Sequence, residues 1–169
     1  VTKDELNRQR FVYPLLVVGV PQAEAIAKDF ATDFFQVIPT KSEVIPHAHE
    51  VLAELATRYN LYILSNGFHE LQRHKMRSAG LDIYFKDVIL SDDIGILKPD
   101  ARLFHHALKV ANATIADSLM IGDSWESDVV GASSVGMHQV YFSPKADASS
   151  LPFTPTYFIT DLRQLLEVL

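Results

Sequence analysis

From about residue 44 onward, apolar residues recur alternately at strand-like and helix-like spacing, which favours a parallel sheet covered by helices. Short apolar runs predict strands at 61–64, 88–90, 119–121, 139–142 and 157–159. Helical spacing predicts helices at 46–59, about 70–80, 101–111 and 128–135, with Gly136 as a stop, and a last helix from 161. The pattern therefore predicts an α/β fold with a Rossmann-like parallel sheet and flanking helices.

The first 42 residues carry a helical pattern without strands of a sheet. Apolar residues between Pro21 and Pro39 recur every three or four positions and predict a helix. Its buried face is expected to carry Phe30, Phe34 and Phe35. Thr2 to Glu5 resembles a capping box that opens a helix towards residue 13, which Pro14 should end or kink, and 15–20 reads as a weak strand. We therefore divide the chain into a helical segment, 1–42, and an α/β core, 43–169.

Composition narrows the class of protein. A chain of 169 residues with 48% hydrophobic content can bury a substantial core. The absence of cysteine excludes disulfides and thiolate metal sites and fits a cytoplasmic protein. The longest apolar run, 15–20, is far shorter than the roughly 20 residues of a membrane helix. A net charge of -6 without a basic run argues against a nucleic-acid polymer as partner, but it is compatible with a small anionic substrate.

Polar residues lie where two predicted strands end. Ser65, Asn66 and Gly67 follow the run 61–64, where a hydroxyl and two backbone N–H groups could bind an anion. Lys98 lies in the loop after the next strand and could stabilise charge on a phosphate. Carboxyl ends of parallel strands are where such folds bind ligands. Taken singly, each has a plain alternative, an Asn-Gly turn or a solvated lysine.

A third motif, Gly122-Asp123, follows the apolar run 119–121, with Asp128 five positions after Asp123. Magnesium is usually held by one or two carboxylates, waters and substrate phosphate oxygens. Asp123 fits a direct or water-mediated ligand, and Asp128 fits an acceptor that orients metal-bound water or Lys98. The alternative is a turn at Asp123 followed by a helix cap at Asp128. The histidines do not suggest a metal site, because the spacing of His47 and His49 and of His105 and His106 prevents convergence on one ion.

In this order the three motifs resemble three of the four signature motifs of the haloacid dehalogenase superfamily of phosphohydrolases. The strings Asn66-Gly67-Phe68 and 91–99 resemble its bacterial nucleoside 5'-monophosphatase branch. The resemblance implies an Mg²⁺ cofactor, a small phosphorylated metabolite as substrate, an aspartyl-phosphate intermediate and a cap domain of which 1–42 is a remnant. It places Ser65 and Asn66 on the phosphate, Lys98 on phosphate and nucleophile, and Asp123 on the metal. The Gly-Asp pair favours phosphatase over dehalogenase.

The fourth motif, an Asp-x-Asp pair that carries the nucleophile on an N-terminal strand, does not occur in these 169 residues. The chain alone is therefore predicted to be inactive. The resemblance places the missing strand between the strands that end at Ser65 and Ile121. We expect it to come from an N-terminal portion that was cut off or is absent from this sequence, which begins with Val1, or from another chain. The alternative function is a catalytically inactive phosphate-binding or scaffold module of the same fold.

Overall fold

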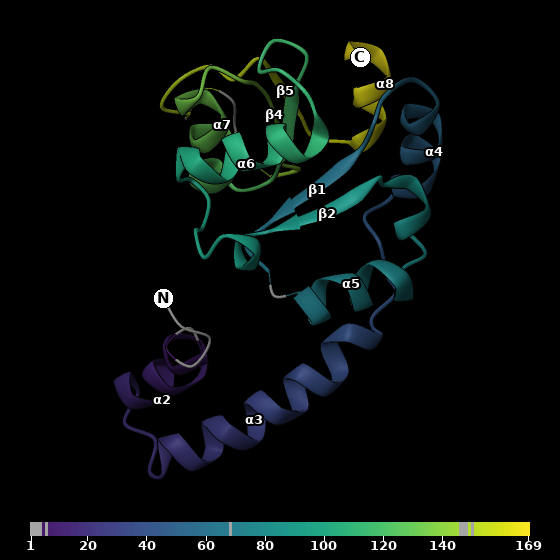
Figure 1. Cartoon of the computed structure of the whole chain (residues 1–169). Helices are drawn as coiled ribbons and strands as arrows, with labels where there is room; N and C mark the ends of the chain where they lie inside the picture. The colour runs from purple at the N-terminus through teal and green to yellow at the C-terminus, as the bar shows by residue number, and fades with distance from the viewer. Residues whose placement is uncertain (1–4, 6, 68, 146–148, 150) are drawn as a thin grey trace.

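The computed structural model describes residue 5 and residues 7–67, 69–145, 149 and 151–169 (Figure 1). A helical N-terminal segment, purple to blue in Figure 1, lies below a part in which strands and helices alternate. The predicted α/β fold is confirmed, with parallel strands and flanking helices. The predicted boundary between the two segments at 42 and 43 remains a prediction.

The strands of the described residues form two parallel sheets. β1 (Tyr62–Ser65) pairs with β2 (Asp87–Leu90). β3 (Leu119–Gly122), β4 (His138–Phe142) and β5 (Tyr157–Ile159) form the second sheet in that order. Within the described part of the chain, β1 and β3 thus each have one paired edge and one unpaired edge.

Burial of the strands is unusual for a parallel sheet. β2 and β4 are buried from their second residue onward, whereas every residue of β1 and β3 is partly exposed. Strands of parallel sheets are normally covered on both faces. The extra exposure of β1 and β3 therefore sets them apart from β2, which is buried although it also has one unpaired edge among the described residues.

The two sheets nevertheless share a hydrophobic core. Leu61, before β1, and Ile121 of β3 pack against one cluster of buried residues. Leu64 of β1 and Met120 of β3 pack against a second cluster, which is centred on Phe104. Side chains from both sheets thus meet in each cluster, although no ladder joins β1 to β3.

The helices of the α/β part lie close to the positions that the sequence predicts. α6 (Ala101–Ala111) has the predicted bounds, because the Asp100 carboxylate accepts a hydrogen bond from the Arg102 N–H at 2.9 Å and caps the helix. The other helical elements of the α/β part are α4 (Ala48–Arg58), α5 (His69–Ser78), η3 (Asp82–Tyr84), η4 (Ser91–Asp93), η5 (Trp125–Val130), α7 (Gly131–Ser134), η7 (Leu162–Gln164) and α8 (Leu165–Val168).

The N-terminal segment differs from its prediction near Pro14. The predicted capping box lies at residues outside those described. The π-helical η1 (Arg8–Val12) runs directly into α2 (Tyr13–Val17), so the expected end of the helix at Pro14 and the strand at 15–20 are wrong, while a kink at Pro14 stays a prediction. Pro14 lies in the first turn of α2, a position where helices tolerate proline.

The predicted second helix is confirmed as α3 (Ala23–Val37), and η2 (Ile38–Thr40) follows it. Its buried residues are Ala23 and Ala27, whereas Phe30 is 60% exposed, so the expected phenylalanine face is wrong at that position. The small alanines allow close approach of η1, and the ring of Phe11 then contacts the phenylalanines at the flank of α3. These are Phe30, Phe34 and Phe35, with ring centroids 5.4 to 6.1 Å from that of Phe11.

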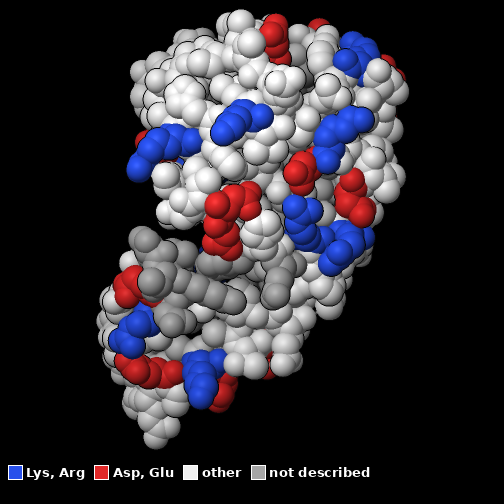
Figure 2. Space-filling model, in the orientation of Figure 1, with Lys and Arg blue, Asp and Glu red and all other residues white. Residues whose placement is uncertain are grey.

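Among the described residues, no helix has both the length and the apolar character to cross a membrane. On the face drawn in Figure 2, acidic and basic side chains are interspersed over both segments. That face therefore presents a mixed surface rather than a field of one sign.

Candidate active site

Two hydrogen bonds join the loop after β1 to the loop before α6. The Asn66 side-chain oxygen accepts from the Lys98 backbone N–H at 2.7 Å, and its amide nitrogen donates to the Lys98 carbonyl at 3.1 Å. The Ser65 hydroxyl oxygen accepts from the Gly67 N–H at 3.1 Å, which leaves the hydroxyl hydrogen for another acceptor. These bonds thus hold the loop of residues 65–67 beside Lys98, although Asn66 and Lys98 lie 32 positions apart in the sequence.

The Lys98 ammonium group lies between the end of β1 and Asp128. Its Nζ donates to the Leu64 carbonyl at 2.7 Å and to Asp128 Oδ1 at 2.6 Å. Only 9% of the Lys98 side chain and 7% of the Asp128 side chain are exposed. A lysine has three N–H donors, of which these contacts use two. The ion pair therefore places a buried cation at the carboxyl end of β1.

Asp123 and Asp128 occupy one turn but different environments. Asp128 is buried, and its Oδ2 accepts from the Ser124 N–H at 3.0 Å while Oδ1 contacts Lys98. Asp123 is exposed and, within the described residues, makes no hydrogen bond or ion pair. The helical segment begins at Trp125 with Ser124 as its cap, so the predicted start at Asp128, and the reading of Asp128 as a cap, are wrong.

Gly122 is required by the close approach of Asp128. A Cβ at position 122 would lie 2.2 Å from Asp128 Oδ2 and 2.4 Å from its Cβ. Both distances are far below van der Waals contact, and relief would move the carboxylate away from Lys98. The glycine therefore allows the turn to fold back onto the end of β3.

We expect Gly122→Ala to lower the free energy of unfolding by about 3 kcal/mol, the upper end of the cost of overpacking. Gly136→Ala is the matched control, because nothing lies within 4 Å of its added Cβ and only its φ of +77° opposes the change. That control should cost about 1 kcal/mol. Urea denaturation of both variants checks the difference, and equal losses would contradict the steric account.

The residues of the turn could supply some, but not all, of the ligands of a divalent cation. Asp123 offers an exposed carboxylate, and Asp128 is held in place by Lys98 and Ser124. Magnesium commonly takes only one or two protein carboxylates and fills its other positions with water and phosphate oxygens. Within the part of the chain that the structure describes, no three His, Asp or Glu side chains converge as a metal cage. Any cage would thus need ligands beyond these residues.

Sequence reasoning missed a histidine and a carboxylate beside the site. His69 Nε2 contacts Asp93 Oδ1, which joins the first residue of α5 to η4. The two residues lie 24 positions apart, and neither belongs to a strand end. Their only sequence signal is their place directly after residues 65–67 and shortly before Lys98.

Aromatic residues pack beside the turn that carries Asp123. The Trp125 ring lies with its centroid 5.3 Å from that of Tyr141 and 4.7 Å from that of Phe153. Trp125 is therefore engaged in packing, although it is only partly buried. Phe68, the last residue of the string 66–68, lies outside the described residues.

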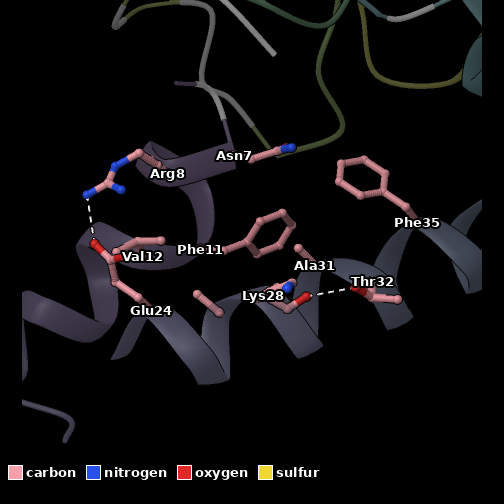
Figure 3. A pocket seen from close by; sticks show the side chains of 10 residues that line it. Asn7, Arg8, Phe11, Val12, Glu24, Lys28, Ala31, Thr32 and Phe35 are labelled. Carbon is pink, nitrogen blue, oxygen red and sulfur yellow. Dashed lines mark hydrogen bonds and ion pairs between the residues drawn. The ribbon is translucent and has the colours of Figure 1, made fainter. Parts of the chain in front are cut away.

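A separate groove of about 410 Å³ lies in the N-terminal segment between η1 and α3. Figure 3 shows the Arg8–Glu24 ion pair at one end, Phe35 at the other and Phe11 between them. None of the predicted site residues lines it. We place the candidate active site by the hydrogen bonds around Lys98, since a phosphate site needs donors and cations rather than an apolar groove.

The sheets are parallel, and polar loops lie at the carboxyl ends of β1 and β3. This arrangement is typical of α/β proteins, which bind ligands at that edge of the sheet. The chain belongs to the haloacid dehalogenase-like hydrolases, since the model of this family matches residues 10–136. The resemblance to this family that was noted from the motifs is thereby confirmed.

Several relatives carry names that describe phosphatases. The chain is 27% identical over 170 residues to the putative HAD-hydrolase YfnB of Bacillus subtilis, covering 100% of this chain and 71% of that protein. It is 34% identical to a phosphoserine phosphatase of Thermus thermophilus, covering 87% of this chain and 58% of that one. It is 29% identical to the pyrimidine 5'-nucleotidase YjjG of Escherichia coli, covering 74% of this chain and 56% of that one. The chain thus spans little more than half of the two named phosphatases.

The fold resembles the crystal structure of YfnB bound to magnesium, with a TM-score of 0.88 at 25% identity. That match covers 99% of this chain and 72% of the other. The whole described arrangement, including the N-terminal helices, is therefore one that a relative also adopts.

Proposed function

We propose that the protein is a magnesium-dependent phosphohydrolase that acts on a small phosphate monoester through an aspartyl-phosphate. The observation that carries this proposal is the buried Lys98 ammonium, held by Leu64 and Asp128 beside the loop that begins at Ser65. A fixed cation next to a hydroxyl and backbone N–H groups suits the charge that develops on a transferring phosphoryl group. The names of the phosphatase relatives support the same reaction class.

Each residue has a distinct part in the proposed site. The Ser65 hydroxyl donates to a phosphate oxygen, and the Asn66 backbone N–H supplies a further donor while its side chain holds Lys98. The remaining Lys98 N–H donor serves the phosphate and the nucleophile. Asp128 fixes the ammonium group, so the cation does not have to be ordered during the reaction.

Asp123 is the proposed metal ligand, and Asp128 supports the metal site through the turn. Bound Mg²⁺ would neutralise charge on the phosphate and orient it. The exposed Asp123 carboxylate and the restrained Asp128 carboxylate support this assignment. The magnesium-bound structure of YfnB supports the choice of magnesium as the metal.

The covalent steps require two carboxyl groups from outside these 169 residues. One aspartate oxygen attacks phosphorus, the ester P–O bond breaks, and the second, protonated aspartate gives its proton to the leaving alkoxide. Water then attacks phosphorus and gives its proton to that second aspartate. The bond between phosphorus and the first aspartate breaks, which releases orthophosphate and restores the carboxylate.

The unpaired edges of β1 and β3 are the proposed place of that nucleophile strand. Both edges belong to parallel strands, and both strands are more exposed than their neighbours β2 and β4. A strand between them would cover both edges and pair their backbone groups, which avoids the cost of about 1 to 3 kcal/mol for each group that is buried without a partner. We propose that another part of the polypeptide, or a second chain, supplies it.

The proposed substrate class is the nucleoside 5'-monophosphates. The strings 66–68 and 91–99 support this choice, as does the relative named as a pyrimidine 5'-nucleotidase. Other relatives bear the names phosphoserine phosphatase and glyceraldehyde 3-phosphate phosphatase, so these esters form the comparison panel. Residues 1–42 are the proposed remnant of a helical cap, which would close over the phosphate site and select among such substrates.

We expect residues 1–169 alone to show no turnover of a phosphate ester, and the protein made from its complete reading frame to show Mg²⁺-dependent turnover. The physical reason is that the nucleophile strand is proposed to lie outside these residues. Release of orthophosphate from p-nitrophenyl phosphate and from nucleoside 5'-monophosphates, with Mg²⁺ or with EDTA, measures this directly.

Hydrogen exchange on the same two samples serves as the control for the proposed strand. Amides of β1 and β3 should exchange more slowly in the complete protein, while those of β2 should change less because β2 would not adjoin the added strand. A complete protein that binds phosphate without hydrolysing any ester would favour the inactive binding module. Turnover by residues 1–169 alone would refute the external nucleophile.

A further inference from the structure

A histidine and a carboxylate connect the two loops of the candidate site a second time. His69 Nε2 contacts Asp93 Oδ1, so the first residue of α5 is joined to the last residue of η4. The side chains are 46% and 25% exposed, respectively. The contact thus lies at the rim of the site rather than in the core.

Asp93 is itself held firmly by the end of β2. Its Oδ2 accepts from the N–H of Leu90, which is fully buried, at 2.7 Å. Burial alone would raise the pKa of Asp93, but the hydrogen bonds from Leu90 and His69, with the nearby charges of His69 and His106, keep this pKa below its ordinary value. The carboxylate is therefore ionised and anchored to a strand, which makes it a rigid partner for His69.

The two connections enclose the proposed phosphate loop. Asn66 is bound to Lys98 by two hydrogen bonds, and three positions later His69 is bound to Asp93. The Gly67 N–H lies between these attachments, so fixing both ends limits how this loop can turn. Gln72 of α5 also approaches it, since a Cβ on Gly67 would lie 3.2 Å from Gln72 Oε1.

We propose that His69 and Asp93 are positioning residues that keep the backbone N–H of Asn66, and the Gly67 N–H that holds the Ser65 hydroxyl, oriented for phosphate binding. The inference rests on the proposed phosphate site. Its physical basis is preorganisation, because donors that are already held in place bind an anion without a further ordering cost. His69 does not touch the phosphate in this proposal, so its loss should weaken binding more than it slows the chemical steps.

His69→Ala in the complete protein is expected to raise KM for p-nitrophenyl phosphate by about three- to tenfold, the effect of losing one exposed charge-assisted contact, with kcat changed less than about twofold. His69→Gln retains an N–H donor for Asp93 and should restore most of the loss. Asp93→Ala should resemble His69→Ala. Calorimetric titration with inorganic phosphate provides the second measurement, which does not depend on turnover.

His47→Ala is the matched control, since His47 and Glu50 form a comparable exposed pair, 3.3 Å apart, that involves neither loop. It should leave both KM and phosphate affinity unchanged. If the wild type binds phosphate and His69→Ala binds it equally well, this inference is overturned but the proposed function is not. A wild-type protein that neither binds phosphate nor hydrolyses the ester would overturn the proposed function, and this inference with it.

Discussion

Asp123→Asn in the complete protein is expected to lower Mg²⁺-dependent phosphatase turnover by at least about 100-fold at fixed metal concentration. Even residues that only support a metal ligand change metal affinity or activity by about 10- to 100-fold, so a direct ligand should cost no less. The amide also removes one negative charge from a turn in which Asp128 is already paired with Lys98. Steady-state rates over a range of Mg²⁺ concentrations measure the loss and show whether excess metal recovers it.

Glu126→Gln is the control for this experiment. Glu126 is also exposed, lies three positions after Asp123 and loses the same charge on substitution. Its variant should keep the metal dependence of the wild type. Unchanged kinetics in Asp123→Asn would remove Asp123 from the metal site, and equal losses in both variants would point to the general charge of the turn.

Lys98→Met is expected to lower the free energy of unfolding by about 3 to 5 kcal/mol, in addition to abolishing phosphate binding. The substitution leaves the Asp128 carboxylate without its cation while 93% of that side chain remains covered, given its 7% exposure. Removing one partner of a buried ion pair is costly because the other charge stays desolvated. Urea denaturation of the variant and the wild type measures the difference.

Two further variants test whether the loss of stability comes from leaving a buried charge unpaired rather than from removing any ion pair. Asp128→Asn in the Lys98→Met background should recover part of the lost stability, because no buried charge then remains unpaired. Arg8→Met breaks the Arg8–Glu24 pair, whose side chains are 47% and 66% exposed, and should cost less than about 1 kcal/mol. A Lys98→Met variant as stable as Arg8→Met would show that the Lys98–Asp128 pair contributes little to folding.

The sequence predicted most of the α/β part because its apolar runs are separated by clear stop signals. α6 and β5 have the predicted bounds, β1 is shifted by one residue towards the C-terminus, and β3 ends one residue later than predicted. The helix after Asp123 begins earlier than predicted, since Ser124 caps it and Asp128 instead turns back towards Lys98. A buried carboxylate inside a helical segment cannot be recognised from apolar spacing.

The N-terminal segment was harder to predict because its apolar residues do not mark its buried face. Alanines form the contact side of α3, while Phe30 of α3 and Leu16 and Val17 of α2 are exposed. Pattern-based prediction assumes that large apolar side chains point inward, and it assumes that a proline interrupts a helix. Both assumptions fail here, at Phe30 and at Pro14.

The position of the candidate residues at strand ends could be predicted from the sequence, whereas their functional roles stay predictions and the connections between them were not predicted. Ser65, Asn66, Lys98, Asp123 and Asp128 are all brought to the carboxyl ends of β1 and β3. The exchange of hydrogen bonds between Asn66 and the Lys98 backbone, and the contact of His69 with Asp93, depend on loop geometry across 24 to 32 positions. Local sequence carries no signal for such pairings.

The unpaired edges of β1 and β3 also bear on how the chain behaves at high concentration. Rows of backbone donors and acceptors without partners are templates on which strands of other molecules can add. β1 and β3 are short and apolar, Tyr-Ile-Leu-Ser and Leu-Met-Ile-Gly, and neither carries a charged residue that would discourage such pairing. We therefore expect residues 1–169 by themselves to associate edge to edge, and the proposed nucleophile strand would prevent this by covering both edges.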